Sequence, residues 1–234
     1  RDLMPLRRAR NLATPRSWLN TSMPMLVAIL LQGGLARMDI FMLEMLGHEA
    51  SVGLFGAAAT VVTLLTMFQQ AVLGLVNPLV RPALSEGSGS MREIQARGFR
   101  LLVMLIFPAS IALLVFGEPI LRLFGPSYPQ AYAALMILVV GRMISTQLSL
   151  TNMWLRFSGG ARLIARVMLF ALVFNVALNL VLVPSYGMTG AATATASALI
   201  GSSVFLSVSM HRRLGISPWP FHALVSGWRR NERV

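Results

Sequence analysis

The chain has 234 residues, of which 56% are hydrophobic and only 12% are charged, and its mean hydropathy is positive. This composition is typical of an integral membrane protein and argues against a water-soluble globular domain. The 20 basic residues are all arginine and the net charge is +12, while cysteine and lysine are absent, which excludes disulfides, thiol nucleophiles and a lysine-containing phosphate loop.

Six hydrophobic stretches follow one another along the chain. A hydrocarbon layer about 30 Å thick is crossed by roughly 20 helical residues, and backbone polar groups in lipid must be satisfied within the spanning segment. The sequence therefore predicts an all-α, polytopic membrane bundle of six transmembrane helices within a lobe at 18–211. A cytoplasmic linker at 1–17 and an interfacial cytoplasmic tail at 212–234 flank this lobe. The predicted helices cover 18–46, 52–76, 99–116, 131–154, 163–183 and 188–210.

The arginines alternate along these connections. They concentrate in the N-terminal segment, the second-to-third connection, the fourth-to-fifth connection and the C-terminal tail, whereas the opposite side has only Arg122 and the spans contain Arg37 and Arg142. Positive residues favour the cytoplasmic side of a membrane. We therefore expect this segment in a bacterial inner membrane, with both of its ends on the cytoplasmic side. No basic face lies away from the membrane, which argues against nucleic acid as a partner.

Three groups of residues resemble one family. They are Asp39, Leu43, Gly47, Val52–Phe55 and Ala58; LFGPSYPQA at 123–131; and Asn175, Asn179, 182–184, Gly187, 190–192 and Thr195. In this order and at these places, they resemble the C-terminal half of oligosaccharide flippases, of the O-antigen type, in the multidrug, oligosaccharidyl-lipid and polysaccharide exporter superfamily. Glu44 departs from the pattern, because members commonly have a small residue there.

The resemblance implies one lobe of a two-lobe transporter with twelve or more helices, which works by alternating access and makes or breaks no bond. Its implied substrate is a polyprenyl pyrophosphate-linked oligosaccharide. The implied partners are membrane lipids and a missing N-terminal six-helix lobe. The basic, proline-containing start of the chain resembles a connection between spans, so we expect a further piece upstream.

Charged residues inside the spans are the candidate functional groups, since an ionised side chain deep in lipid costs about 2.5 to 3.5 kcal/mol and usually has a partner or faces water. Asp39 and Arg142 lie at comparable depths in the first and fourth spans, which predicts an ion pair between them. Arg37, two residues from Asp39, points to another face and is left for an anionic ligand. Asp39 and Glu44 are also candidate proton or sodium acceptors.

Uncharged polar residues complete the predicted site. Arg37 is suited to bind a pyrophosphate bidentately, and Gln32, Gln69 and Gln70 to bind sugar hydroxyls. Another group is interpreted as making hydrogen bonds between helices: Gln147, Asn152, Asn175 and Asn179. We predict no catalytic residue, metal site or cofactor, because the histidines are too scattered to share a metal.

Alternatives remain. Arg37, Asp39 and Glu44 are also compatible with an interfacial position, with side chains reaching headgroups. A cation-coupled multidrug exporter of the same fold is a second function, although two deep arginines would repel cationic drugs. A membrane enzyme of polysaccharide assembly is a third, although the longest outer connection, 117–130, carries only Glu118 and Arg122 as charged residues. An inactive truncated half is the remaining interpretation.

Overall fold

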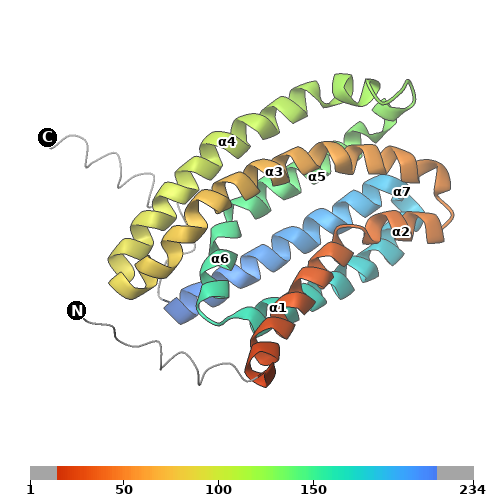
Figure 1. The fold of residues 1–234 in the computed structure, drawn as a ribbon. Coiled ribbons are helices and arrows are strands. Elements are labelled where there is room, and N and C mark those ends of the chain that lie inside the picture. Colours follow the sequence, from red (N-terminus) through yellow and green to blue (C-terminus); the bar gives the residue numbers. More distant parts are fainter. Residues whose placement is uncertain (1–14, 215–234) are drawn as a thin grey trace, which may run out of the picture.

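A computed structural model describes residues 15–214 of the chain (Figure 1). All regular elements in this range are helices, which confirms the predicted all-α class. They are α1 (Pro15–Leu35), α2 (Met38–Met45), α3 (Glu49–Glu86), α4 (Ser88–Arg122), the short 3-10 helix η2 (Tyr128–Ala131), α5 (Tyr132–Gln147), α6 (Ser149–Phe157) and α7 (Ala161–Leu214). Most of the predicted linker and tail, at 1–14 and 215–234, lies outside the described residues.

Several of these helices are long and apolar enough to cross a membrane. Among the described residues these are Glu49–Glu86, Gly89–Arg122 and Ala161–Arg212, and the bent pair Ser22–Leu35 and Met38–Met45 is a fourth candidate if it is counted as one span. α5 has 16 residues and is followed at once by the short α6. All six predicted stretches coincide with helical segments, while the count of six membrane crossings remains a prediction.

The long element α7 is a helical hairpin. Gly187 has φ 52° and ψ −129°, outside the helical region, and divides α7 into a first arm at 161–186 and a second arm at 188–214. The arms then run side by side, since a Cβ at Gly190 would lie 2.5 Å from the carbonyl oxygen of Leu182. Figure 1 shows the turn of the hairpin at the end of the bundle where α2 also ends. Glycine at 187 and 190 thus allows a tight turn and a close contact between the arms.

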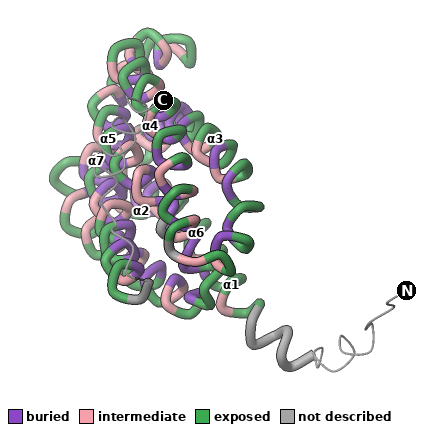
Figure 2. The backbone as a smooth tube through the Cα atoms, turned by 90° about the vertical axis from the view of Figure 1, so that its left-hand side faces the viewer, coloured by how far each residue is buried: buried purple, intermediate pink, exposed green. Residues whose placement is uncertain are grey.

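Two large apolar clusters fill most of the interior, one toward each end of the bundle, and a small third one joins Leu35, Ala171 and Ala198. The first includes Ala83, Met91, Trp154, Ile164 and Met210, and the second joins α2, the start of α3, the end of α4, α5 and the hairpin turn. Many large apolar side chains face outward instead, and Figure 2 shows buried residues on the inner faces of the helices and exposed residues on the outer faces. This arrangement suits a bundle surrounded by lipid.

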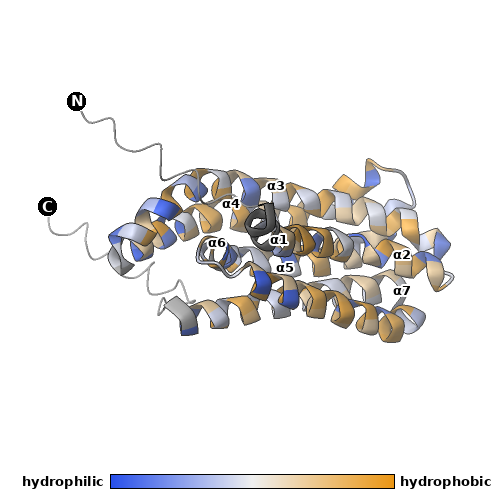
Figure 3. Ribbon diagram, turned by 60° about the horizontal axis from the view of Figure 1, so that its bottom comes forward, coloured by the Kyte–Doolittle hydropathy of each residue, from blue (hydrophilic) through white to orange (hydrophobic). Residues whose placement is uncertain are grey.

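The arginine-bearing connections meet at one end of the bundle. The first cluster brings together the end of α3, the start of α4, α6 and both the start and the end of α7. Most of the described arginines lie on these segments: Arg81, Arg92, Arg97, Arg100, Arg156, Arg162, Arg166 and Arg212. Figure 3 shows hydrophilic segments at this end and hydrophobic ones over the middle of the bundle. The fold therefore has the charge asymmetry that the sequence predicts, and we call this the arginine-rich end.

Candidate functional site

A bend between α1 and α2 places the first charged residues. α1 ends after the pair Gly33 and Gly34, the backbone N–H of Arg37 donates to the carbonyl of Gly34 at 3.1 Å, and α2 leaves at an angle of 45°. Two successive glycines weaken a helix and are a common cause of such a bend. The bend brings α2 against α7, and Asp39, in the first turn of α2, is only 2% exposed.

The carboxylate of Asp39 is held by three side chains from α7. Its Oδ1 accepts hydrogen bonds from Nδ2 of Asn175 at 3.2 Å and of Asn179 at 3.0 Å, and its Oδ2 accepts one from the hydroxyl of Thr195. Nδ2 of Asn175 also donates to Oγ1 of Thr195 at 3.0 Å. All four residues are buried. We call them the Asp39 cluster, in which hydrogen bonds compensate much of the cost of burying a charge.

The hairpin is what assembles this cluster. Asn175 and Asn179 are four residues apart, so they lie on one face of the first arm. Thr195 belongs to the second arm, and the turn at Gly187 brings it opposite Asn175. The predicted interhelical role of Asn175 and Asn179 is therefore confirmed, and α7 provides all the partners of Asp39.

The predicted ion pair between Asp39 and Arg142 was wrong. The ion pairs among the described residues are Arg97 with Glu93 and Arg122 with Glu118, both exposed. Arg142 has a buried Nε without a hydrogen-bond partner. The two helices have different neighbours, since α2 packs mainly on α7 and α3 whereas α5 packs on α7, α4 and α3. Depth counted along helices did not reveal which faces meet, and α7 offered nearer polar groups.

Arg37 is exposed and separate from the Asp39 cluster. It is the residue before α2 and makes no side-chain capping bond. No ion pair within residues 22–212 involves it. Glu44, seven residues further on and also exposed, makes no ion pair in this part of the chain either. The two charges on the outward side of this bent segment are thus both accessible.

The glutamines predicted to bind sugar differ in their surroundings. Gln69 is half-buried, and its Oε1 accepts a hydrogen bond from the hydroxyl of Thr146 at 3.3 Å, which links α3 to α5. Gln32 on α1 and Gln70 on α3 are exposed. Gln69 therefore has a contact between helices, and the ligand role of all three remains a prediction.

Sequence reasoning missed Thr195 as a functional candidate and missed the partners of Asp39. A usable signal was present. Two asparagines at a spacing of four inside an apolar helix form a polar face that needs a buried partner, and Asp39 is the acidic residue predicted at depth on a neighbouring span. Asp39 and its three partners also belong to the first and third groups of residues that carry the family resemblance.

Taken together, an all-helical bundle with several candidate membrane spans and a buried, hydrogen-bonded carboxylate within one of them defines a class, the polytopic membrane proteins. The family follows from the sequence itself. The chain belongs to the MatE family, whose model matches residues 24–181.

Two curated proteins are similar in sequence to this chain. The chain is 27% identical over 161 residues to the probable low-salt glycan biosynthesis flippase Agl15 of Haloferax volcanii, covering 68% of this chain and 34% of the relative. It is 29% identical over 232 residues to an FAD transporter of Shewanella oneidensis, covering 92% of this chain and 50% of that protein. The chain thus spans between about a third and a half of the length of these two relatives. These relatives are transporters and flippases rather than enzymes, in agreement with the prediction.

Two solved structures share the fold. One is the outward-facing conformation of a multidrug resistance MATE family transporter of the MOP superfamily, with a TM-score of 0.67 and 22% identity over 83% of this chain and 45% of that one. The other is a MOP superfamily transporter from Pyrococcus furiosus, with a TM-score of 0.61 and 21% identity over 84% of this chain and 45% of that one. These similarities establish the fold of this chain as that of part of a MATE transporter.

Proposed function

We propose that this chain is one lobe of a flippase that moves a lipid-linked oligosaccharide, carried on a polyprenyl pyrophosphate, across a bacterial cytoplasmic membrane by alternating access. The family and the similarity to a glycan biosynthesis flippase support this proposal. The arginine-rich end is then the cytoplasmic end. A second six-helix lobe and the surrounding membrane lipids are the partners, and the chain binds no nucleic acid.

The observation that carries the proposal is that Arg37 is exposed and has no ion pair among the described residues, while Asp39, two residues further along the chain, is hydrogen-bonded by α7. Asp39 gives both its oxygens to α7, so it does not neutralise Arg37. Counted from the end of α2, Arg37 lies roughly 13 Å into the span at the helical rise. A free arginine at that depth favours an anion with two acceptor oxygens, which a pyrophosphate offers. Gln32 and Gln70, both exposed, are the proposed contacts for sugar hydroxyls, and Gln69 contributes its remaining amide donors.

The Asp39 cluster has a separate role in this proposal. The carboxylate of Asp39 belongs to α2 and contacts both arms of α7, so it links three helical segments. A change in its charge therefore alters how these segments pack. We propose Asp39 as the residue where a proton or sodium ion is coupled to transport. Glu44, exposed at the outer part of α2, is the proposed site where that ion first arrives, and Arg142 is a further coupling candidate through its unpartnered Nε.

A cation-coupled multidrug exporter is the second candidate, and the comparisons fit it equally well. The Asp39 cluster is compatible with this alternative too, because a carboxylate and the hydroxyl of Thr195 are oxygen groups of the kind that bind a small cation. In that case Arg37 is not a substrate contact. Its positive charge would oppose the entry of a cationic drug.

One experiment separates the two functions. The full-length transporter is reconstituted in vesicles, and translocation of a fluorescent polyprenyl pyrophosphate-linked oligosaccharide is compared with export of a cationic dye. Arg37→Ala is expected to abolish oligosaccharide flipping while leaving the protein in the membrane, and Arg81→Ala, exposed at the arginine-rich end, serves as the matched control. Dye export that rises in Arg37→Ala, with no flipping by the wild type, would establish the exporter instead.

A further inference from the structure

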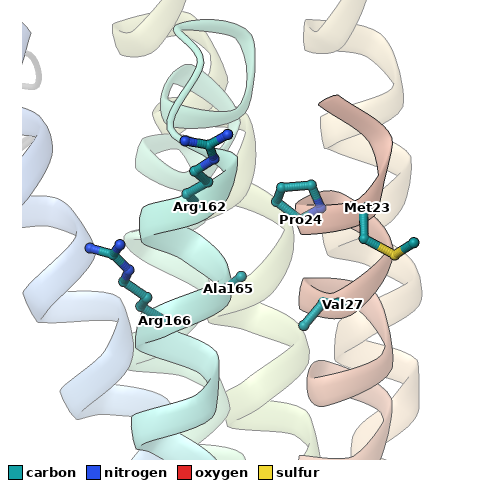
Figure 4. Close-up of a pocket in the computed structure, with 6 residues that line it drawn as sticks. All are labelled: Met23, Pro24, Val27, Arg162, Ala165 and Arg166. Carbon is teal, nitrogen blue, oxygen red and sulfur yellow. The ribbon is translucent and has the colours of Figure 1, made fainter. Parts of the chain in front are cut away.

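A groove lies between α1 and the start of the first arm of α7, at the side of the bundle toward the arginine-rich end (Figure 4). It has a volume of about 380 Å³ and is lined by Met23, Pro24, Val27, Arg162, Ala165 and Arg166. Its last residue, Arg166, precedes Asn175 by roughly two and a half helical turns. The groove is therefore distinct from the Asp39 cluster and from Arg37.

The two sides of the groove offer apolar surface. Met23, Pro24 and Val27 line it from α1, and Ala165 faces them from α7 (Figure 4). Met23 and Val27 are 48% and 38% exposed, so the described chain leaves part of this surface uncovered. An apolar channel of this kind at the outer face of a membrane bundle fits a hydrocarbon chain, because a hydrated ion gains nothing from it.

The upper part of the groove is positively charged. Arg162 and Arg166 are one turn apart on the same arm, and both are exposed. Figure 4 shows the side chain of Arg162 extending upward along α7, and that of Arg166 leaving α7 on the side away from α1. α1 and α7 contain no acidic residue, and the ion pairs of the described residues lie elsewhere, on α4. Both arginines thus keep their charge available to a ligand at the edge of the groove.

We propose that this groove binds one anionic phospholipid, with its phosphate on Arg162 and Arg166 and one acyl chain along Met23, Val27 and Ala165. Arginine matches the geometry of a phosphate through paired N–H donors. Basic pockets between membrane helices on the cytoplasmic side are suited to acidic headgroups. Charge and apolar walls together select an amphiphile, and a diacyl phospholipid is the amphiphile that surrounds the protein. The residues that line the groove all belong to this chain, and none of them is part of the Asp39 cluster.

The charge is tested by native mass spectrometry of the chain released from bilayers of phosphatidylethanolamine and phosphatidylglycerol. The wild type is expected to keep one phosphatidylglycerol in preference to phosphatidylethanolamine. The double variant Arg162→Gln/Arg166→Gln should keep roughly thirtyfold less, at about 1 kcal/mol for each arginine near an acidic lipid surface. Arg92→Gln/Arg100→Gln removes the same charge from exposed positions on α4 and should match the wild type. Equal retention in all three proteins, or equal loss in both double variants, overturns the proposal.

The apolar part is tested without changing charge. Ala165→Leu fills the groove and is expected to lower phosphatidylglycerol retention several-fold, while Val173→Leu, at an exposed position on the same arm, should leave it unchanged. Thermal melting of each variant in detergent monitors folding. Two further outcomes overturn the proposal. Displacement of the lipid by inorganic pyrophosphate would reassign the groove to a soluble anion, and displacement by a stoichiometric amount of a polyprenyl pyrophosphate would reassign it to that lipid.

Discussion

The Asp39 cluster and the junction between α5 and α6 are both buried and polar, yet they differ in how their hydrogen bonds are completed. In the Asp39 cluster the carboxylate receives three donors, and only Oδ1 of Asn179 lacks a partner. The junction shows the opposite pattern. It has several buried polar atoms without a partner in the structure, on Arg142, Gln147, Ser149, Asn152 and Trp154.

This difference shows which region stabilises the lobe and which weakens it. A buried polar group that forms its bonds is nearly neutral or mildly favourable, whereas one that loses its bonds costs about 1 to 3 kcal/mol. The helix also breaks at the junction, since Leu148 lies between α5 and α6 with its N–H donating to Ser145 rather than four residues back. We expect the Asp39 cluster to resist opening and the junction to open first.

The largest loss of stability should come from removing the carboxylate at the centre of the Asp39 cluster. Asp39→Leu leaves the side chains of Asn175, Asn179 and Thr195 without their acceptor, so we expect the free energy of unfolding to fall by about 2 to 4 kcal/mol. Unfolding in mixed micelles, followed by tryptophan fluorescence, measures this change. Glu44→Leu replaces an exposed acid on the same helix and should change stability little. A similar effect of both substitutions would contradict the comparison.

The next largest change in stability is expected at the turn of the α7 hairpin, which brings Thr195 opposite Asn175 in the Asp39 cluster. Gly187 has a positive φ of 52°, so Gly187→Ala should destabilise the lobe by about 1 to 2 kcal/mol. Gly201 lies in the second arm with open space around it, and Gly201→Ala should stabilise by about 0.5 to 1 kcal/mol. The same micelle unfolding assay tests the opposite signs, and a loss of stability in both variants would rule out the backbone explanation.

A substitution at the junction between α5 and α6, where buried polar atoms lack partners, should not lower the free energy of unfolding. Arg142→Met removes the charge and the buried unpartnered Nε and leaves a flexible apolar chain that ends about where Nε lies. We expect the free energy of unfolding to stay constant or to rise by about 1 kcal/mol. Thermal melting in detergent is a sufficient measurement. A clear loss of stability would show that Arg142 has partners that this comparison does not recognise.

The smallest expected effect concerns the hydrogen bond that joins α3 to α5 near the junction. Thr146→Val removes the hydroxyl that donates to Gln69 and should cost about 0.6 kcal/mol, the average for bonds between membrane helices. Thr60→Val is the matched control, because the Thr60 hydroxyl donates to the carbonyl of Gly56 within its own helix. A double-mutant cycle with Gln69→Leu isolates the bond, and an interaction energy of zero would remove it from the packing of the lobe.

Much of the fold could be predicted from hydropathy because each helix carries its signal locally. All six apolar stretches were recognised, and the connection at Gly187 was placed correctly between the last two of them. The break between α5 and α6 was not predicted, since Leu148 and its neighbours read as continuous apolar helix. The bend after Gly34 was also missed, because the hydrophobic stretch continues through it.

The candidate site was only partly predictable, since a contact between helices depends on rotation about each axis as well as on depth. Asp39 was identified as a charge that needs a partner, but its depth matched Arg142 while its direction matched Asn175 and Asn179. The spacing of the two asparagines already indicated which face of their helix carries the polar groups. Thr195 carried no such signal, because it lies among many small and hydroxyl-bearing residues of the second arm.

The hairpin at Gly187 also limits how the lobe moves. The connection between the two arms is a single residue, which is too short to let either arm slide past the other by a full helical pitch of about 5.4 Å. Gly190 also lies close against the backbone of Leu182, so the arms are in tight contact next to the turn. Both arms must therefore travel as one rigid lever, and any displacement of α2 transmitted through Asp39 reaches the arginine-rich end along both of them at once.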